Sequence, residues 1–309
     1  MIVRDRPSPL GMLITYRGSI IPRIRVELAT TILTAMAVVG APHVFPGVSF
    51  PKLTPAPFSL IGLALAIFLG FRNSASYDRW WEARKVWGDV LVRGRSLARL
   101  AIAHVRPPAD GPDDGLATRL ALRPLGFAFV LKHALRGTPD EESAAYFSAA
   151  EATAVRASPN AANFALTFAS ADIAAAAAAG RLDPRIAQSL EEAVTGLAAD
   201  HAACERLRWT PLPFSYSLLL HRTAHLFCLA LPFGLVDSIG YLTPFIVALI
   251  AYAFFGLDAL GDELEEPFGL EANDLALDAL CRRLEIDVLE TTGRTDLPPV
   301  IARKGIILT

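Results

Sequence analysis

The feature that most constrains this chain is the stretch from Pro57 to Trp87, which begins uncharged and turns polar without a helix breaker. Phe58 to Phe71 holds no charged residue, and Arg72-Asn73-Ser74 follows at once. No proline interrupts the chain until Pro107. The stretch therefore predicts one long helix, apolar in its first half and charged in its second.

The apolar half of this helix is short for a membrane span. A spanning helix needs about 20 apolar residues to cross about 30 Å of hydrocarbon, whereas Phe58 to Phe71 covers about 21 Å. Arg72 and Asn73 are then expected near the membrane boundary or deeper, where polar side chains face a protein interior or water. We expect one face of the helix to face a water-containing region.

Three large apolar residues of this helix share one face. Leu63, Ile67 and Phe71 are spaced i, i+4 and i+8, which brings their side chains into one stripe. Such a stripe most often faces lipid or a packed core, and a pore lining has the same geometry. The spacing alone leaves all three uses open.

The composition favours a membrane protein with a sizeable soluble part. Of the 309 residues, 53% are hydrophobic and 19% are charged, and the formal net charge is −2. A soluble domain would be nearer a quarter charged. The near-neutral charge leaves no basic face and argues against a nucleic-acid partner. The three cysteines, Cys204, Cys228 and Cys281, are far apart and are expected to be buried or inert thiols.

The sequence predicts an all-α membrane protein with four transmembrane helices in two hairpins and a helical cytosolic region. Arginines cluster before the first span and after Phe71, so the positive-inside rule places both termini in the cytoplasm and the loop 42–57 outside. The predicted spans are residues 26–45, 57–78, 212–236 and 239–260, and the cytosolic helices occupy 79–210 and 261–309, with prolines including Pro124, Pro139, Pro159 and Pro184 between segments.

The third apolar region is broken by His221, Arg222 and His225. Ionisable groups inside a span are costly, so they are expected to be functional or paired; the alternative is a position near the inner interface with Arg222 reaching toward water. No plausible further ligand accompanies the two histidines, so no metal site is expected. The chain also lacks phosphate-loop, zinc-protease and serine-hydrolase motifs, and it is not expected to be an enzyme.

An acidic run follows the fourth span, from Asp262 to Glu266, and continues past Pro267-Phe268-Gly269 to Glu271 and Asp274. Carboxylates are good Ca²⁺ ligands, but the run does not have the spacing of an EF-hand. The simpler interpretation is a solvated carboxylate cluster near the start of the last helix.

A series of short motifs runs along the chain from residue 16 to residue 275. Those in the first half are Tyr16-Arg17-Gly18-Ser19-Ile20, Phe68-Leu69-Gly70-Phe71-Arg72-Asn73, Ser76-Tyr77-x-Arg79-Trp80, Glu82-Ala83-Arg84 and Trp87-Gly88. Those in the second half are Leu220-His221-Arg222-Thr223, Leu231-Pro232-Phe233, Thr243-Pro244-Phe245, Glu266-Pro267-Phe268-Gly269 and Asn273-Asp274-Leu275. Together they resemble the bestrophin family, in its bacterial branch.

This resemblance implies an ion channel, in which the whole chain 1–309 forms one bestrophin-like domain and five copies surround a central pore. It implies that the narrow neck is lined by Leu63, Ile67 and Phe71. It also implies a second, cytosolic constriction at Leu212, the apolar residue before Pro213. The expected partners are monovalent ions, the lipid bilayer of the bacterial inner membrane and further copies of the chain.

The departures from the family bear on calcium and on the ion. In animal bestrophins a dense acidic run after Pro-Phe-Gly binds Ca²⁺, whereas here only Glu271 and Asp274 follow closely. Calcium regulation is therefore not expected, and neither is a cofactor. The bacterial branch favours cation selectivity; the alternatives are a chloride channel, as in animals, or a membrane scaffold that conducts nothing. A secondary transporter is disfavoured because the halves show no internal repeat.

Overall fold

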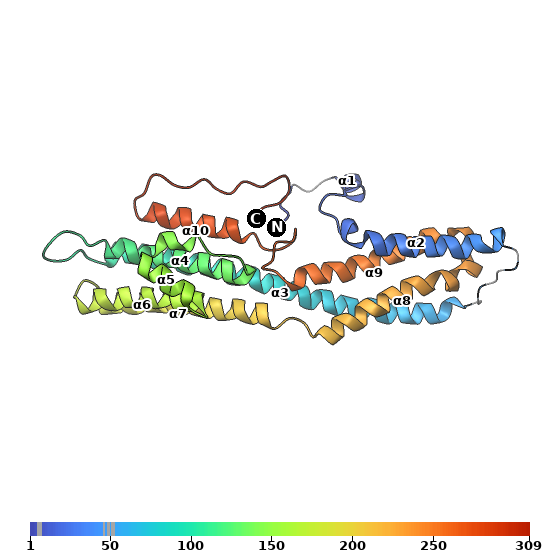
Figure 1. Ribbon diagram of the computed structural model, residues 1–309, viewed down its shortest axis with the longest axis horizontal. Coiled ribbons are helices and arrows are strands. Elements are labelled where there is room, and N and C mark those ends of the chain that lie inside the picture. Colours follow the sequence, from blue (N-terminus) through green and yellow to red (C-terminus); the bar gives the residue numbers. More distant parts are fainter. Residues whose placement is uncertain (5–7, 46, 48–49, 51–52) are drawn as a thin grey trace. The chain divides into compact units, whose positions relative to one another are not determined.

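The computed structural model describes residues 1–4, 8–45, 47, 50 and 53–309. Over this part of the chain the only β-structure is isolated bridges, from Ile307 to Ile2 and to Lys304. The helices of Figure 1 are α1 (Pro9–Leu13), α2 (Ile21–Val44), α3 (Pro55–His104), α4 (Leu116–Arg136), η1 (Ser143–Tyr146), α5 (Ala149–Ala157), α6 (Ala161–Ala178), α7 (Pro184–Trp209), α8 (Phe214–Ile239), η2 (Gly240–Leu242), α9 (Thr243–Glu265) and α10 (Leu277–Thr291). The all-α class expected from the sequence is confirmed.

The chain divides into two compact units. One, here called the apolar unit, comprises Arg4–Trp80 and Pro211–Glu266. The other, here called the larger unit, comprises Met1–Val3, Trp81–Thr210 and Pro267–Thr309.

The expected long helix is a single element of 50 residues, α3. It contains the uncharged run and its polar continuation without a break. It ends at His104, three residues before Pro107. Proline cannot donate the backbone hydrogen bond of a helix interior, so the absence of proline after Pro57 is what allows this length.

The apolar unit is built from α2, α8, α9 and the first part of α3. Helix α2 packs on α8 and α9, which also pack on each other. Its core includes Leu65 and Leu69 of α3 together with Phe227 of α8 and Phe255 of α9. Close approach of α3 to α8 depends on glycine, because a Cβ atom on Gly234 would overlap the ring of Phe58.

The outside of this unit is apolar as well, as a membrane requires. Among the described residues, four helical stretches are long and apolar enough to span one: Ile21–Val44, Pro55–His104, Ala161–Ala178 and Phe214–Glu265, the last containing both α8 and α9. Less than a third of the most apolar window is buried in each of the three stretches that belong wholly or partly to the apolar unit. Large side chains such as Leu33, Leu226 and Phe245 are among those exposed.

Two helices extend beyond the predicted membrane spans. Helix α2 begins at Ile21 rather than residue 26, since Pro22 is tolerated in the first turn of a helix. Helix α9 runs through the acidic residues to Glu265 instead of ending near 260. Its last turns carry carboxylates that pair with an arginine of α3, as described below.

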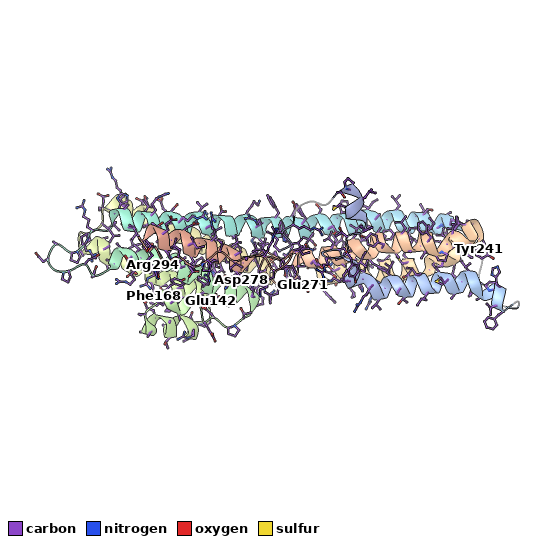
Figure 2. All side chains as sticks on the ribbon, turned by 90° about the horizontal axis from the view of Figure 1, so that it is seen from above. Glu142, Phe168, Tyr241, Glu271, Asp278 and Arg294 are labelled. Atoms are coloured by element: carbon purple, nitrogen blue, oxygen red, sulfur yellow. The ribbon has the colours of Figure 1, made fainter. Side chains whose placement is uncertain are left out.

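The larger unit is a bundle in which α4 packs on α6 and α10, and α6 packs on α7. Charged side chains tie its helices together. Lys132 of α4 lies between Glu142 and Asp278, both labelled in Figure 2. The two chain ends belong to this unit, where Val3 N–H donates to the carbonyl of Ile306 over 2.8 Å.

In this unit one helix ends at a glycine and another continues through a proline. Gly180, with a φ of 67°, follows the end of α6, as is common after the last turn of a helix. Pro124 does not separate two helices, because it lies inside α4. Both Pro124 and its neighbours are buried, and tertiary packing of this kind overrides the local cost of a proline.

Helix α6 is apolar because it is rich in alanine, and it lies within the larger unit. Its Asp172 pairs with Arg119 over 3.1 Å and with Arg123 over 2.7 Å, both on α4. Arg123 is 3% exposed and also pairs with Glu151 of α5 over 2.7 Å. One buried guanidinium thus joins α4, α5 and α6.

The close approach at Gly234 gives a first prediction. Gly234→Ala forces the ring of Phe58 to move, and overpacking of this kind lowers the free energy of unfolding by about 1–3 kcal/mol. Thermal unfolding in detergent measures it. Gly40→Ala is the matched control, since its Cβ atom meets nothing within 4 Å. Equal stability of the two variants would contradict the close packing of α3 on α8.

The Arg123 junction gives a prediction about pH. The hydrogen bond from Arg123 lowers the pKa of Glu151 to about 2, although burial opposes it. A lowered carboxyl pKa stabilises the fold above the unfolded value of about 4.3 and loses that effect as pH falls toward 2. Glu151→Gln should cost about 1 kcal/mol at neutral pH and progressively less below about pH 4. Glu141→Gln, at an exposed glutamate, is the control. A loss of stability in Glu151→Gln that does not change with pH would contradict the ion pair between Arg123 and Glu151.

Candidate functional site

The three stripe residues of α3 lie on the surface of the apolar unit. Leu63, Ile67 and Phe71 are 61%, 48% and 64% exposed. Leu65 and Leu69, on the opposite side of the same helix, are 3% and 0% exposed. Core packing within one chain is therefore not the use of this stripe. What remains is lipid, a second copy of the chain, or a water-filled path.

Leu212 is half-buried, directly before the proline that precedes α8. Its backbone N–H donates to Oε1 of Glu265 over 3.0 Å. The carboxylate at the end of α9 thus fixes the entry of the chain into α8. This hydrogen bond of Leu212 leads to α9 and not to the α3 stripe.

Arg72, the residue after Phe71, points into the unit. Its side chain is 2% exposed and is surrounded by carboxylates of α9. One Nη atom donates to Asp258 Oδ1 over 2.7 Å. The other donates to Asp262 and lies 3.5 Å from Oε2 of Glu265. The sequence left two surroundings open for a polar side chain at this depth, a protein interior or water. Arg72 lies in a protein interior.

Neighbouring polar residues of α3 bond to the same helix. Nδ2 of Asn73 donates to the carbonyl of Leu257 over 3.0 Å, and Nε of Arg79 donates to the carbonyl of Glu265 over 3.1 Å. Two guanidinium groups and an amide of α3, together with three carboxylates of α9, therefore fasten the two helices to each other. Since a buried charge is tolerated only when it is paired, this contact fixes how α3 is rotated.

Of the three ionisable residues in the third apolar region, the two histidines are paired, whereas Arg222 is exposed. His221 Nδ1 lies 2.7 Å from Oδ2 of Asp258, the carboxylate that also holds Arg72. His225 Nδ1 lies 2.8 Å from the carbonyl of His221, and the two rings are 4.1 Å apart. They border a cavity of about 100 Å³ that Glu27 and Asp262 also line.

The carboxylates considered for calcium serve the loop after α9. Asp274 is 2% exposed, and its Oδ2 accepts the backbone N–H of Glu271 over 2.7 Å. Among the described residues no three His, Cys, Asp or Glu side chains are grouped so that they could hold a metal ion. The two residues are thus tied to each other, and their predicted weakness as a calcium clasp stays a prediction.

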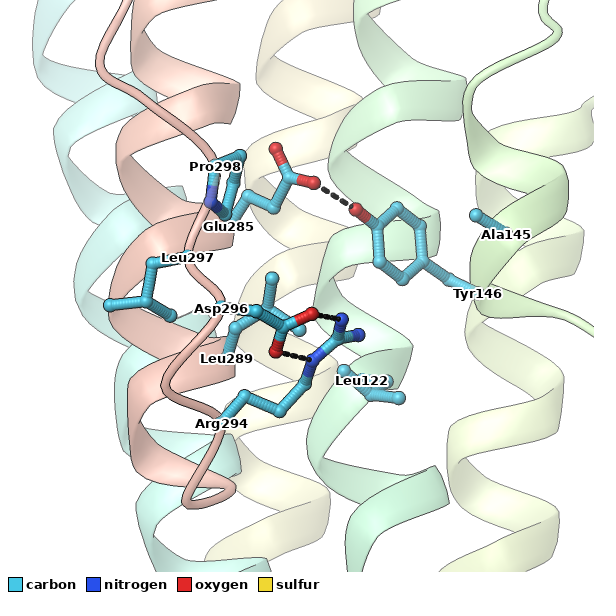
Figure 3. Close-up of a pocket in the computed structure, with 9 residues that line it drawn as sticks. All are labelled: Leu122, Ala145, Tyr146, Glu285, Leu289, Arg294, Asp296, Leu297 and Pro298. Carbon is cyan, nitrogen blue, oxygen red and sulfur yellow. Dashed lines mark hydrogen bonds and ion pairs between the residues drawn. The ribbon is translucent and has the colours of Figure 1, made fainter.

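The larger unit has a cavity of about 430 Å³, shown in Figure 3, that the sequence gave no sign of. It is lined by Leu122 of α4, Tyr146 of η1, Glu285 of α10 and the segment 294–298. Tyr146 Oη donates to Glu285 Oε1 over 2.6 Å, and burial raises the pKa of Tyr146. The other two polar side chains of the lining, Arg294 and Asp296, pair with each other over 2.6 Å.

The Arg72 cluster gives a prediction about stability. Asp258 is 5% exposed and serves both Arg72 and His221, so Asp258→Asn removes the most buried negative charge beside Arg72, which keeps Asp262 and Glu265, and should cost about 1.5–3 kcal/mol. Asp262 is 46% exposed, and water can replace its carboxylate, so Asp262→Asn should cost about 1 kcal/mol. Unfolding temperatures of the two variants test this order. The reverse order would mean that Asp258 is not the principal partner of Arg72.

Comparisons with known proteins agree on one family. A family model described as bacterial and fungal bestrophin protein matches residues 1–290. The chain is 42% identical over 299 residues to a voltage-dependent anion channel-forming protein of Mesorhizobium japonicum, covering 97% of this chain and 94% of that protein. It is 39% identical over 302 residues to the voltage-dependent anion channel-forming protein YneE of Escherichia coli K12, covering 97% of each.

A solved structure agrees. The crystal structure of a bacterial bestrophin homologue from Klebsiella pneumoniae superposes with a TM-score of 0.80 at 39% identity, covering 88% of this chain and 99% of that chain. The fold, the order of the motifs and the extent of these matches lead to the same conclusion. The chain belongs to the bestrophin family, in its bacterial and fungal branch.

Proposed function

We propose that this chain is the subunit of a membrane ion channel that passes monovalent ions passively. Five copies surround one path, and each contributes the α3 stripe of Leu63, Ile67 and Phe71 to its neck. The observation that carries the proposal is the exposure of this stripe beside the buried Leu65 and Leu69. The names of the relatives as channel-forming proteins support it.

The physics of such a neck is control of wetting and not ion binding. Leucine, isoleucine and phenylalanine side chains offer no oxygen to replace the water around an ion, so a ring of them gates by width and by dewetting. Leu212, held at its backbone by Glu265, forms a second apolar ring on the cytosolic side. Transport needs no catalytic step, so the protein has no enzymatic role.

Cations are the favoured ions because of where the charges lie. Arg72, the first arginine after the neck, is buried and held by carboxylates. Its one positive charge faces the three negative charges of Asp258, Asp262 and Glu265, and Asp262 is 46% exposed. The arginine closest to the neck therefore does not offer its charge to anions, while part of the acidic cluster reaches solvent.

An anion channel is the second candidate. The relatives from Mesorhizobium japonicum and Escherichia coli are both named voltage-dependent anion channel-forming proteins. Arg25 of α2 and Arg222 of α8 are exposed and could supply the positive field that anions need. The sign of the reversal potential decides between the two.

The membrane is the bacterial inner membrane, and both termini lie in the cytoplasm. In support, the first residues and the last pair directly in the larger unit, where Leu308 N–H donates to the carbonyl of Met1 over 2.9 Å. Chain ends on one side require an even number of crossings, as α2, α3, α8 and α9 provide. Calcium is not needed for opening in this proposal, since only Glu271 and Asp274 closely follow the Pro267-Phe268-Gly269 segment.

The neck is tested by shortening its side chains. Leu63→Ala, Ile67→Ala and Phe71→Ala should each widen and wet the neck and raise the single-channel conductance or open time about twofold or more. Currents of the purified protein in a planar bilayer between unequal potassium chloride solutions measure both conductance and reversal potential. A reversal near the potassium equilibrium potential supports cation selectivity, and one near that of chloride supports the anion candidate.

Leu65→Ala is the matched control, because the same truncation is made on the buried side of α3. It should lower the free energy of unfolding by about 2–5 kcal/mol and leave the conductance of the folded protein unchanged. A wild type and three neck variants that all conduct nothing would contradict the channel and favour a non-conducting scaffold.

A further inference from the structure

We propose that Asp78 is a specificity-determining residue of the channel, a carboxylate that favours cations where the path leaves the neck. This inference rests on the proposed function, since it requires that the α3 stripe lines the path. It concerns a residue on the same helix and within the same unit as the stripe.

The position of Asp78 on α3 carries the inference. It lies seven residues after Phe71, which on a helix is about 10 Å along the axis and about 20° around it. Like Phe71, Asp78 is exposed, and so is Ser74 between them. Arg72 and Ser76 lie on the buried face of the same segment. Asp78 is therefore the first charged residue on the stripe's own face after the neck.

The charge of Asp78 is not used elsewhere. Within the described part of the chain its carboxylate takes part in no hydrogen bond or ion pair. The neighbouring arginines are engaged, since Arg72 pairs with Asp258 and Arg79 donates to the carbonyl of Glu265. A lone exposed aspartate is ordinary in itself. An unpaired aspartate on the same face of α3 as the neck residues is distinctive, because no partner neutralises the charge that it directs at the path.

Symmetry multiplies the effect. Copies of Asp78 form a ring of carboxylates about 10 Å from the ring of Phe71, which is close to one Debye length at physiological ionic strength. The ring raises the concentration of cations at the neck exit and lowers that of anions. Asp262 is a weaker source, because its carboxylate is committed to Arg72.

The experiment measures the cation-to-anion permeability ratio of Asp78→Asn and Asp78→Lys in a planar bilayer. Removing the charge should lower the ratio about three- to tenfold, and reversing it should lower the ratio further. The direction holds whichever ion the wild type prefers. The effect should fade in about 1 M salt, where the Debye length is about 3 Å.

Asp110→Asn is the matched control, since Asp110 is an exposed aspartate on the loop after α3, and it should leave the ratio unchanged. Size-exclusion chromatography checks that each variant assembles as the wild type does. If Asp78→Lys does not assemble, the permeability ratio of Asp78→Asn alone tests the proposal. Conducting Asp78 variants with the wild-type ratio at low salt would overturn the role of Asp78 but not the channel. A wild type and neck variants that conduct nothing would overturn both.

Discussion

The structure of the apolar unit depends on how one buried guanidinium is satisfied. Arg72 follows Phe71 directly, so the two side chains point about 100° apart around α3. Because Arg72 must reach Asp258 and its neighbours on α9, α3 has only one acceptable rotation. That rotation buries Leu65 and Leu69 and leaves Leu63, Ile67 and Phe71 on the outside. The ion pairs of Arg72 with α9 therefore keep the stripe on the surface of the unit.

The same contact organises the charges around the proposed path. A buried ion pair adds little net stability, but it can select one arrangement among several of similar energy. Here it removes the positive charge nearest the neck from solvent and draws carboxylates toward it. Asp78 lies on a different face of α3 from Arg72, and its carboxylate is not paired. The polar half of α3 therefore has a paired side that holds the fold and an unpaired side that can act on ions.

Much of this could be predicted from the sequence, because it depends on local pattern. The unbroken stretch after Pro57 predicted α3, and the i, i+4, i+8 spacing predicted that Leu63, Ile67 and Phe71 share a face. The partners of Arg72 could not be predicted in this way, since Asp258 lies 186 residues further along the chain and sits in an apolar segment without a motif. Pro124 was misinterpreted for a similar reason, because only tertiary packing shows that α4 continues through it. The cavity of the larger unit is likewise lined by residues scattered over α4, η1, α10 and the segment that follows α10.

The central claim, that the exposed stripe of α3 faces water, is tested most directly by thiol accessibility. The three native cysteines are buried, so a single introduced cysteine reports its own surroundings. Ile67→Cys and Leu33→Cys place it on α3 and on α2, at side chains 48% and 64% exposed in the single chain. In membranes, a charged, water-soluble thiol reagent should modify the cysteine at position 67 faster and reduce the current, and spare the one at position 33. Modification of position 67 no faster than of position 33, with no change in current, would show that the stripe faces lipid or another subunit and would contradict this account.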